Sequence, residues 1–297
     1  MANSDARERL LSELAQHVVF GLATGAFLLL AAVGFSLVRQ VEGFLNIAHA
    51  QLISFGAYAT WMLNVTFGMG VVAAAVIGVL LTVVLSLLQA RLFYHPIHSY
   101  GPDILLITSV GVAFATQGVI EMFVDPGTSL LALANPEPFV VGTVRINPYQ
   151  AGVVVAALAI TLGLYMVFSR TRIGRQIRAV SVDRQLAQSR GVSLTVTSRA
   201  VWVAAGATAG MAGVALGLLG TLTTDIAFSQ ILLIVAVSIF AGFGSLMALL
   251  AAALVTGLAM DVSILWIPTA YRSAIPFAII ILVLVFRTRR AGSLAVA

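Results

Sequence analysis

Of the 297 residues, 60% are hydrophobic and 9% are charged, and the mean hydropathy of +1.06 lies far above that of a soluble globular domain. The formal net charge is +5 and all sixteen basic residues are arginine, which excludes a Walker A nucleotide loop and a Schiff-base enzyme, because both need lysine. The absence of cysteine excludes disulfides, thiolate catalysis and cysteine-ligated metals.

Apolar stretches of roughly 20 residues, the length of a membrane-crossing helix, follow one another along the chain. They are too long and continuous for barrel strands, so we predict an all-α fold, a polytopic integral membrane helical bundle. The charged first 17 residues precede a run of full spanning length, so we expect no cleavable signal peptide and a single membrane domain over residues 1–297. Predicted spans lie at about 18–38, 44–63, 68–93, 103–123, 151–169, 199–220, 226–247, 248–266 and 271–286. Some of the last fit re-entrant or broken helices, so we expect about eight or nine crossings.

The second span opens with the stretch GFLNIAHA, which brings polar side chains into an apolar run. If it is helical, Asn46 and His49 share a face, with Glu42 and Gln51 close by. Polar groups are costly in lipid, so this face is expected to point into the protein or toward a water-filled path. Two interpretations stay open: hydrogen bonds that join helices, and a pocket or solute pathway.

The fourth span carries Gln117 and Glu121, four positions apart, which are candidates for a polar stripe opposite Asn46. Solvation of a helix end explains Glu121 equally well. The following residues 124–150 form the largest loop predicted outside the cytoplasm. Their segment FVVGTVRI alternates around Gly142, which predicts a small β-hairpin, with a structureless connector as the alternative.

Residues 170–199 contain seven arginines and one acidic residue, Asp183. Short arginine-rich loops lie on the cytoplasmic side, and this topology accounts for the positive net charge without nucleic acid. Counting five crossings back places the N-terminus outside, although Arg7 and Arg9 argue weakly against this.

The same loop holds small residues at a spacing of four. This spacing places Ala179, Asp183 and Ala187 along one stripe of a short helix, with Ser181 as its N-cap and Gly191 as its C-cap.

Glycines mark the later spans. Two pairs of small residues in the span at about 199–220 predict close helix packing. They are Gly206 with Gly210 and Gly213 with Gly217. Gly242, Gly244 and Ser245 permit either a broken helix or a plain turn. Asp261 is costly within a membrane, and we expect it to pair with Arg272.

Three of these blocks resemble the permease subunits of branched-chain amino acid ABC importers. GFLNIAHAQLISFGAY is similar to the family's N-F-A-H-G signature at Asn46, Ala48 and His49, with departures at Ile47 and Ala50. GRQIRAVSVDRQLAQSRGVS resembles the cytoplasmic pattern A-x3-D-x3-A-x3-G at Ala179, Asp183, Ala187 and Gly191. IFAGFGSL resembles G-G-x-G-S at Gly242, Gly244 and Ser245, with Ala241 in place of a glycine. The blocks follow the family's order and cover about residues 18–292.

The resemblance implies an inner-membrane permease that forms half of a translocation pathway for a branched-chain amino acid or a related amino acid, amide, urea or organic acid. It implies no enzymatic activity, no metal and no cofactor in this chain, because partner ATPase subunits bind ATP and Mg²⁺. The implied partners are a second related permease or a second copy, two ATPase subunits, a periplasmic solute-binding protein, the solute and membrane lipid. Residues of about 170–198 would form the cytoplasmic coupling loop, and those of about 124–150 a periplasmic loop.

The expected pathway residues are Asn46, His49, Gln51, Gln117, Gly242, Gly244 and Ser245, and the expected ATPase-coupling residues are Arg178, Ala179, Asp183, Ala187 and Gly191. A self-sufficient secondary transporter or channel is the alternative, although it has no need for a cytoplasmic docking helix. An intramembrane enzyme that uses His49 lacks a convergent set of partner residues, because the four histidines are scattered.

Overall fold

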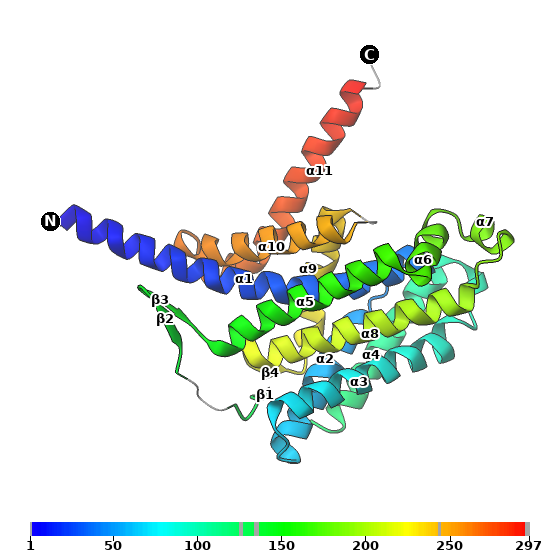
Figure 1. The fold of residues 1–297 in the computed structure, drawn as a ribbon, viewed down its shortest axis with the longest axis horizontal. Helices are drawn as coiled ribbons and strands as arrows, with labels where there is room; N and C mark the ends of the chain where they lie inside the picture. Colours follow the sequence, from blue (N-terminus) through cyan, green and yellow to red (C-terminus); the bar gives the residue numbers. More distant parts are fainter. Residues whose placement is uncertain (1, 125–126, 134–136, 243–244, 295–297) are drawn as a thin grey trace.

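The computed structural model describes residues 2–124, 127–133, 137–242 and 245–294, and these form a bundle of α-helices (Figure 1). The all-α prediction is thus confirmed. The helices are α1 (Ala2–Glu42), α2 (His49–Trp61), α3 (Val71–Gln89), α4 (Pro102–Glu121), α5 (Pro148–Arg170), α6 (Arg172–Val182), α7 (Arg184–Ser189), α8 (Leu194–Leu219), α9 (Ile226–Ala241), α10 (Leu246–Val262) and α11 (Ile275–Leu294). Short π- or 3₁₀-helical segments adjoin them at Met62–Thr66, Ala90–Tyr94, His98–Tyr100, Ser263–Leu265 and Thr269–Ala274.

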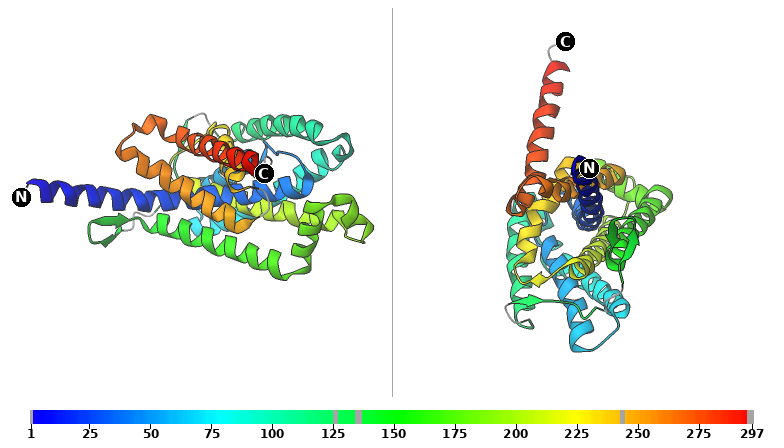
Figure 2. Two further views of the ribbon diagram at one scale, coloured as in Figure 1. Left: turned by 90° about the horizontal axis from the view of Figure 1, so that it is seen from above. Right: turned by 90° about the vertical axis from the view of Figure 1, so that its left-hand side faces the viewer.

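Six helical segments are long and apolar enough to cross a membrane in the described part of the chain. They are Leu10–Glu42, Val71–Tyr94, Pro102–Glu121, Pro148–Arg170, Leu194–Leu219 and Leu246–Leu265. The predicted spans at 44–63, 226–247 and 271–286 coincide with shorter helices, so the number of crossings stays a prediction. Helix α11, which overlaps the predicted span at 271–286, leaves the bundle at a steep angle (Figures 1 and 2).

The first helix, α1, is the axis around which the bundle is built. At about 1.5 Å per residue its 41 residues extend roughly 60 Å, so its first turns project beyond the other helices (Figure 1). Residues 25–38 are buried on every side, against α10, α8, α5 and α9. A helix that is apolar all round suits this central position.

Four short strands in the described residues form two separate ribbons. β2 (Phe139–Val141) and β3 (Val144–Ile146) pair as an antiparallel hairpin around Gly142, whose φ is +64°, which confirms the predicted hairpin. The side-chain amide of Gln16 donates to the Arg145 carbonyl and accepts from its N–H, both at 2.9 Å, and so ties the hairpin to α1. β1 (Thr128–Ser129) pairs with β4 (Leu222–Thr223).

The hairpin and the N-terminus lie at one end of the bundle, and α6 and α7 lie at the other (Figure 1). The side of the membrane on which each end lies stays a prediction.

Glycines on α8 set its distance from α2 and α3, as predicted. A Cβ at Gly206 or Gly210 would lie 2.8 or 2.9 Å from a backbone atom of α3, and one at Gly213 would lie 2.3 Å from the Ile53 carbonyl oxygen of α2. The backbones therefore approach as closely as the missing side chains permit.

A second glycine contact, which the sequence analysis did not single out, joins α1 to α10. A Cβ at Gly257 would lie 2.3 Å from the backbone nitrogen of Gly25 and 2.6 Å from the Gly21 carbonyl oxygen. The spacing of four between Gly21 and Gly25 is the sequence signal that identifies this face.

We predict that Gly257→Ala destabilises the protein by about 1–3 kcal/mol, because the added methyl group forces α1 and α10 apart. The matched control is Gly163→Ala on α5, where a Cβ meets no atom within 4 Å and the higher helix propensity of alanine should stabilise by up to about 1 kcal/mol. Thermal unfolding midpoints in detergent measure both. Equal midpoints for the two variants would contradict the close α1–α10 contact.

Candidate functional site

The chain breaks its helical path between α1 and α2, at residues 43–48. Helix α1 ends at Glu42, and Gly43 follows with φ +81°, its N–H donating to the Arg39 carbonyl at 3.0 Å. A glycine in this conformation terminates a helix at low steric cost. Asn46 consequently lies in a non-helical segment and His49 begins α2, so the prediction that both share one helical face is wrong.

Neighbouring elements satisfy polar groups that this break leaves free. The Ile47 N–H donates to Ser109 Oγ of α4 at 3.0 Å, and the Asn46 carbonyl accepts from the His49 N–H at 3.1 Å. The Tyr94 hydroxyl donates to Asn46 Oδ1 at 3.0 Å. Irregular backbone at membrane depth is tolerated only where protein or water encloses it, and Asn46 is 1% exposed.

His49 joins α2 to the middle of α1. Its Nε2 lies 2.9 Å from the Ala31 carbonyl oxygen, which can only accept, so Nε2 carries the proton. The ring is fully buried and meets Phe35 edge-on, at 6.1 Å between centroids. This contact fits the helix-joining interpretation for Nε2.

Several buried polar atoms near the break have no hydrogen-bond partner among the described residues. They are Asn46 Nδ2, His49 Nδ1, Gln51 Nε2, Gln51 Oε1 and Ser54 Oγ. Buried polar atoms in folded proteins are rarely left unpaired, so this cluster calls for a reason beyond packing.

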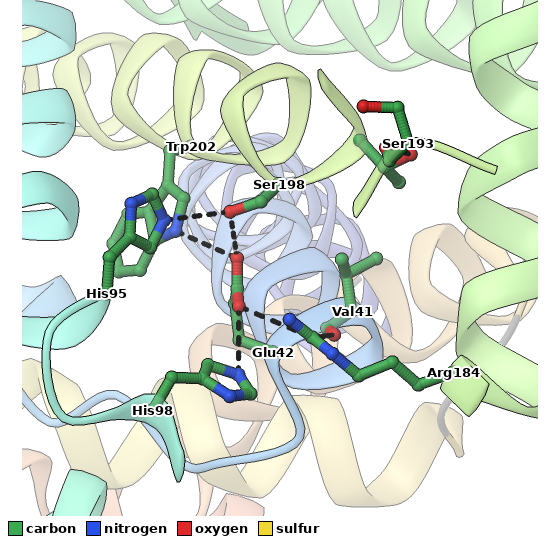
Figure 3. A network of polar contacts seen from close by, with 9 residues as sticks. Val41, Glu42, His95, His98, Arg184, Ser193, Ser198 and Trp202 are labelled. Carbon is green, nitrogen blue, oxygen red and sulfur yellow. Dashed lines mark hydrogen bonds and ion pairs between the residues drawn. The ribbon is translucent and has the colours of Figure 1, made fainter. Parts of the chain in front are cut away.

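Glu42, the last residue of α1, is the centre of a polar network (Figure 3). Its side chain is 2% exposed, and its Oε1 accepts hydrogen bonds from the Ser198 hydroxyl and from Trp202 Nε1, the latter at 3.1 Å. Its Oε2 lies 3.3 Å from His98 Nε2 and 3.7 Å from Arg184 Nη1. A charge enclosed this deeply needs such partners. From the sequence, Glu42 was expected only to lie close to Asn46.

His95 completes this network through Ser198, whose Oγ lies 3.0 Å from His95 Nε2. Since Ser198 gives its only proton to Glu42, His95 Nε2 is the donor. Burial lowers the pKa of His95 from its ordinary value, with the Glu42 carboxylate opposing the shift, which favours the neutral ring. Within the described residues, no group of three His, Asp or Glu side chains is placed to hold a metal ion.

The arginine-rich loop folds into two helices, so the predicted single stripe is wrong. Asp183 adopts an extended conformation between α6 and α7, and its Oδ1 accepts from the Leu186 N–H at 2.9 Å. An aspartate is a better N-cap than a helix-interior residue, and Asp183 takes the capping role predicted for Ser181. Ala179 is exposed, whereas Ala187 is 5% exposed and packs in the main hydrophobic cluster.

Gly191 follows α7 with φ +83°, and the Val192 N–H donates to the Ala187 carbonyl at 3.1 Å, as expected for a C-terminal cap. Arg178, within α6, donates to the Phe168 carbonyl of α5.

The outer face of this helix pair exposes two apolar side chains. Val182 is 87% exposed and Leu186 is 54% exposed, and the exposed Asp183 lies between them. Neither residue was among the predicted coupling residues, although their spacing of four is visible in the sequence. We call Val182, Asp183 and Leu186 the outer face of α6–α7.

The predicted pathway residues of the third block lie near the same end of the molecule. Gly242, with φ +72°, ends α9, and Ser245 Oγ accepts from the Ala248 N–H at 3.3 Å to begin α10. Gly244 lies outside the described residues. Ser245 lines a cavity of about 300 Å³ together with Gln40 and Arg178, so it lies beside α6.

Gln117 lies elsewhere and does not face Asn46. Its Nε2 donates to Glu121 Oε1 and to the Thr224 carbonyl, both at 2.6 Å, near the segment that precedes α9. Asn46 instead pairs with Tyr94. The predicted polar stripe opposite Asn46 is therefore wrong, because α4 presents Ser109 rather than Gln117 to the break.

Asp261 pairs with Arg272, as predicted. Arg272 Nη2 lies 2.8 and 2.9 Å from the two carboxylate oxygens and donates to Thr24 Oγ1 at 2.9 Å. Arg272 also lines a cavity of about 260 Å³ between α1, α8, α9 and α10. Polar Thr24 and Gln230 share this cavity with apolar Phe27, Leu216 and Leu233.

Comparison with known proteins gives one consistent family. The profile of the family described as branched-chain amino acid transport system / permease component matches residues 17–284. The high-affinity branched-chain amino acid transport system permease protein BraD of Pseudomonas aeruginosa is 25% identical over 286 residues, which cover 92% of this chain and 93% of BraD. The corresponding LivH protein of Escherichia coli is 25% identical over 284 residues, 91% of this chain and 92% of LivH. A probable branched-chain amino acid transport permease protein of Methanocaldococcus jannaschii is 25% identical over 217 residues, 69% and 67% of the two chains.

We predict that Arg272→Gln destabilises the protein by about 2–4 kcal/mol, because it leaves the Asp261 carboxylate, 6% exposed, without its counter-charge. The double variant Asp261→Asn/Arg272→Gln should recover most of this loss. Arg175→Gln on the exposed side of α6 is the control, and unfolding midpoints in detergent are compared. A double variant no more stable than Arg272→Gln would show that the pairing has no such role.

Proposed function

The chain belongs to the family of branched-chain amino acid transport permease components, and we propose that it forms half of the translocation pathway of its transporter and is driven by separate ATPase subunits through α6 and α7. It is an inner-membrane permease subunit of an ABC importer. In the described part of the chain, six helical segments of spanning length supply the membrane-embedded body that such a subunit needs.

The observation that carries the proposed coupling is the outer face of α6–α7. Val182 and Leu186 present apolar side chains at the arginine-rich, cytoplasmic end, while Ala187 of the same pair is buried against the bundle. Short helices with exposed apolar anchors dock into grooves of partner proteins. We propose that two ATPase subunits supply these grooves, and that they bind the ATP and Mg²⁺, since the chain has no lysine for a Walker A loop.

The proposed solute is leucine, isoleucine or valine, or a related small compound. The cavity beside Arg272 combines a cation, an adjoining carboxylate and apolar walls, a combination that suits a zwitterion with an apolar side chain. It suits urea or a neutral amide less well, because these lack the charges that the ion pair would attract. The BraD and LivH relatives are named as high-affinity branched-chain amino acid permeases, which favours the same class.

The remaining partners are proposed from the family. They are a second related permease or a second copy of this chain, and a periplasmic solute-binding protein. The hairpin end, with β2 and β3 tied to α1 by Gln16, is the region of the loop at about 124–150 that we propose faces the binding protein.

We propose that the break at residues 43–48 lies on the pathway. Support comes from the unpaired polar atoms of Asn46, His49 and Gln51, which lie inside the bundle rather than toward lipid. Polar groups of this kind inside a membrane bundle are typical of a solute or water path.

We predict that Val182→Asp and Leu186→Asp reduce the amount of ATPase subunit that co-purifies with the chain by at least about tenfold, because each places a carboxylate in an apolar docking contact. Gln188→Asp, exposed on the same helix but outside the outer face, is the matched control. Normal co-purification by both variants would contradict docking here. Gradient-driven uptake by the chain alone in liposomes, indifferent to ATP, would favour a secondary transporter instead.

We predict that Gln51→Leu leaves the stability of the protein unchanged or raises it by about 1 kcal/mol, because it removes a buried amide that has no hydrogen-bond partner. The same variant should lower solute uptake at least about fivefold. Thr161→Val on α5 is the control, since it also removes an unpaired buried hydroxyl but lies away from the break. Unfolding midpoints and uptake per assembled transporter are measured together. Uptake at the wild-type level in Gln51→Leu would remove this residue from the pathway.

A further inference from the structure

Glu42 lies where the cytoplasmic helices meet the break before α2 (Figure 3). We propose that Glu42 is the positioning residue through which a movement of α7 reaches residues 43–48, with Arg184 as its movable counter-ion. This inference rests on the proposed coupling of α6 and α7 to an ATPase.

The partners of Glu42 differ in where they come from. Ser198 and Trp202 are neutral donors on α8, a helix of the bundle. The charged partner, Arg184, is the first residue of α7, and its side chain is 33% exposed. The compensation of a buried negative charge therefore depends partly on a helix that lies at the surface.

Arg184 also holds the end of α1. Its Nη1 donates to the Val41 carbonyl at 2.8 Å, and a cation at this end of a helix interacts favourably with the partial negative charge of the unpaired carbonyls. Asp183, immediately before it, is the N-cap of α7 and belongs to the outer face. A displacement of α7 thus removes a cap from α1 and a counter-ion from Glu42 in one step.

Two routes lead from Glu42 to Asn46. The first is the chain itself, through Gly43, where a Cβ would meet no atom within 4 Å. The second is a set of packed rings: Trp202 stacks on Tyr94 with 5.2 Å between centroids and 11° between planes, and the Tyr94 hydroxyl donates to Asn46 Oδ1. Phe44 lies 5.1 Å from Tyr94 between these routes. The first part of the break, from Gly43 to Asn46, is therefore held by groups that converge on Glu42.

The consequence is a two-state element. While Arg184 is in place, the carboxylate is paired and the break is fixed. When α7 moves, the carboxylate keeps His98 and the donors of α8 but loses its arginine in a low-dielectric interior, and the end of α1 shifts toward water to compensate. Such a shift rotates the backbone at Gly43, where the absence of a side chain permits it, and displaces Asn46.

The test uses the assembled transporter in proteoliposomes. Because this chain has no cysteine, Leu45→Cys, half-buried within the break, gives the chain one thiol, and the rate at which a soluble maleimide labels this chain reports the position of residues 43–48. The rate is measured without nucleotide and with the ATPase trapped by ATP and vanadate. Glu42→Gln, Arg184→Gln, Arg184→Lys and the double variant Glu42→Gln/Arg184→Gln are compared, with exposed Arg190→Gln as the matched control.

We expect trapping to change the labelling rate at least threefold in the Leu45→Cys background and in the control. Glu42→Gln and Arg184→Gln should abolish this change and lower solute uptake per ATP hydrolysed at least tenfold, with ATPase co-purification retained. Arg184→Lys should restore at least half of both readouts, and the double variant should be no worse than the worse single variant.

Several results would overturn the inference. They are an unchanged labelling rate on trapping in the parent background, wild-type coupling in both single variants, and a lower yield of folded protein with normal uptake per ATP. If the parent chain retains no ATPase subunit, the proposed function fails as well. If it retains the ATPase and imports solute while the variants match it, only the role of Glu42 fails.

Discussion

A carboxylate enclosed in an apolar bundle must keep its hydrogen-bond donors and counter-charges, and in this protein that requirement falls on Glu42. The group ends the central helix α1, and it takes its partners from α8, from the segment before α4 and from α7. These elements are held together at one end of the molecule because the carboxylate cannot be left unpaired there. The same residue precedes the break in the helical path, so the position of the break depends on this pairing.

The break illustrates how a membrane protein accommodates irregular backbone. Residues 43–48 lie between two helices, and side chains from α4 and from the segment after α3 satisfy groups that the break exposes. Phe44, Asn46 and Ala48 of this segment are buried inside the bundle. The polar atoms that remain unpaired, on Asn46, His49 and Gln51, are consistent with a segment whose partners change during transport.

Close packing through glycine explains why the helices around α1 leave so little room at the centre. Gly25 and Gly257 bring α1 and α10 to backbone contact, and Gly213 does the same for α8 and α2. Backbones that touch move as one body rather than slide past one another. Displacement of α7 is then conveyed more readily to the non-helical segment than to the packed helices.

The amino-acid sequence by itself determined the features that depend on solvent or on neighbours along the chain. Its composition predicted a helical membrane bundle. Gly142 predicted the hairpin, and Gly191 predicted the end of α7. The pairing of Asp261 with Arg272, eleven positions away, was also predicted. Only the tertiary structure decided which face of each helix is buried. Ala187 packs inward and Gln117 lies away from Asn46. The carboxylate of Glu42 accepts hydrogen bonds from Ser198 and Trp202, which lie 156 and 160 positions away in the sequence. The physical reason is that in a chain apolar on nearly every face, periodicity no longer distinguishes lipid from protein interior, so the choice is made by which helices can approach closely and which polar groups they must enclose.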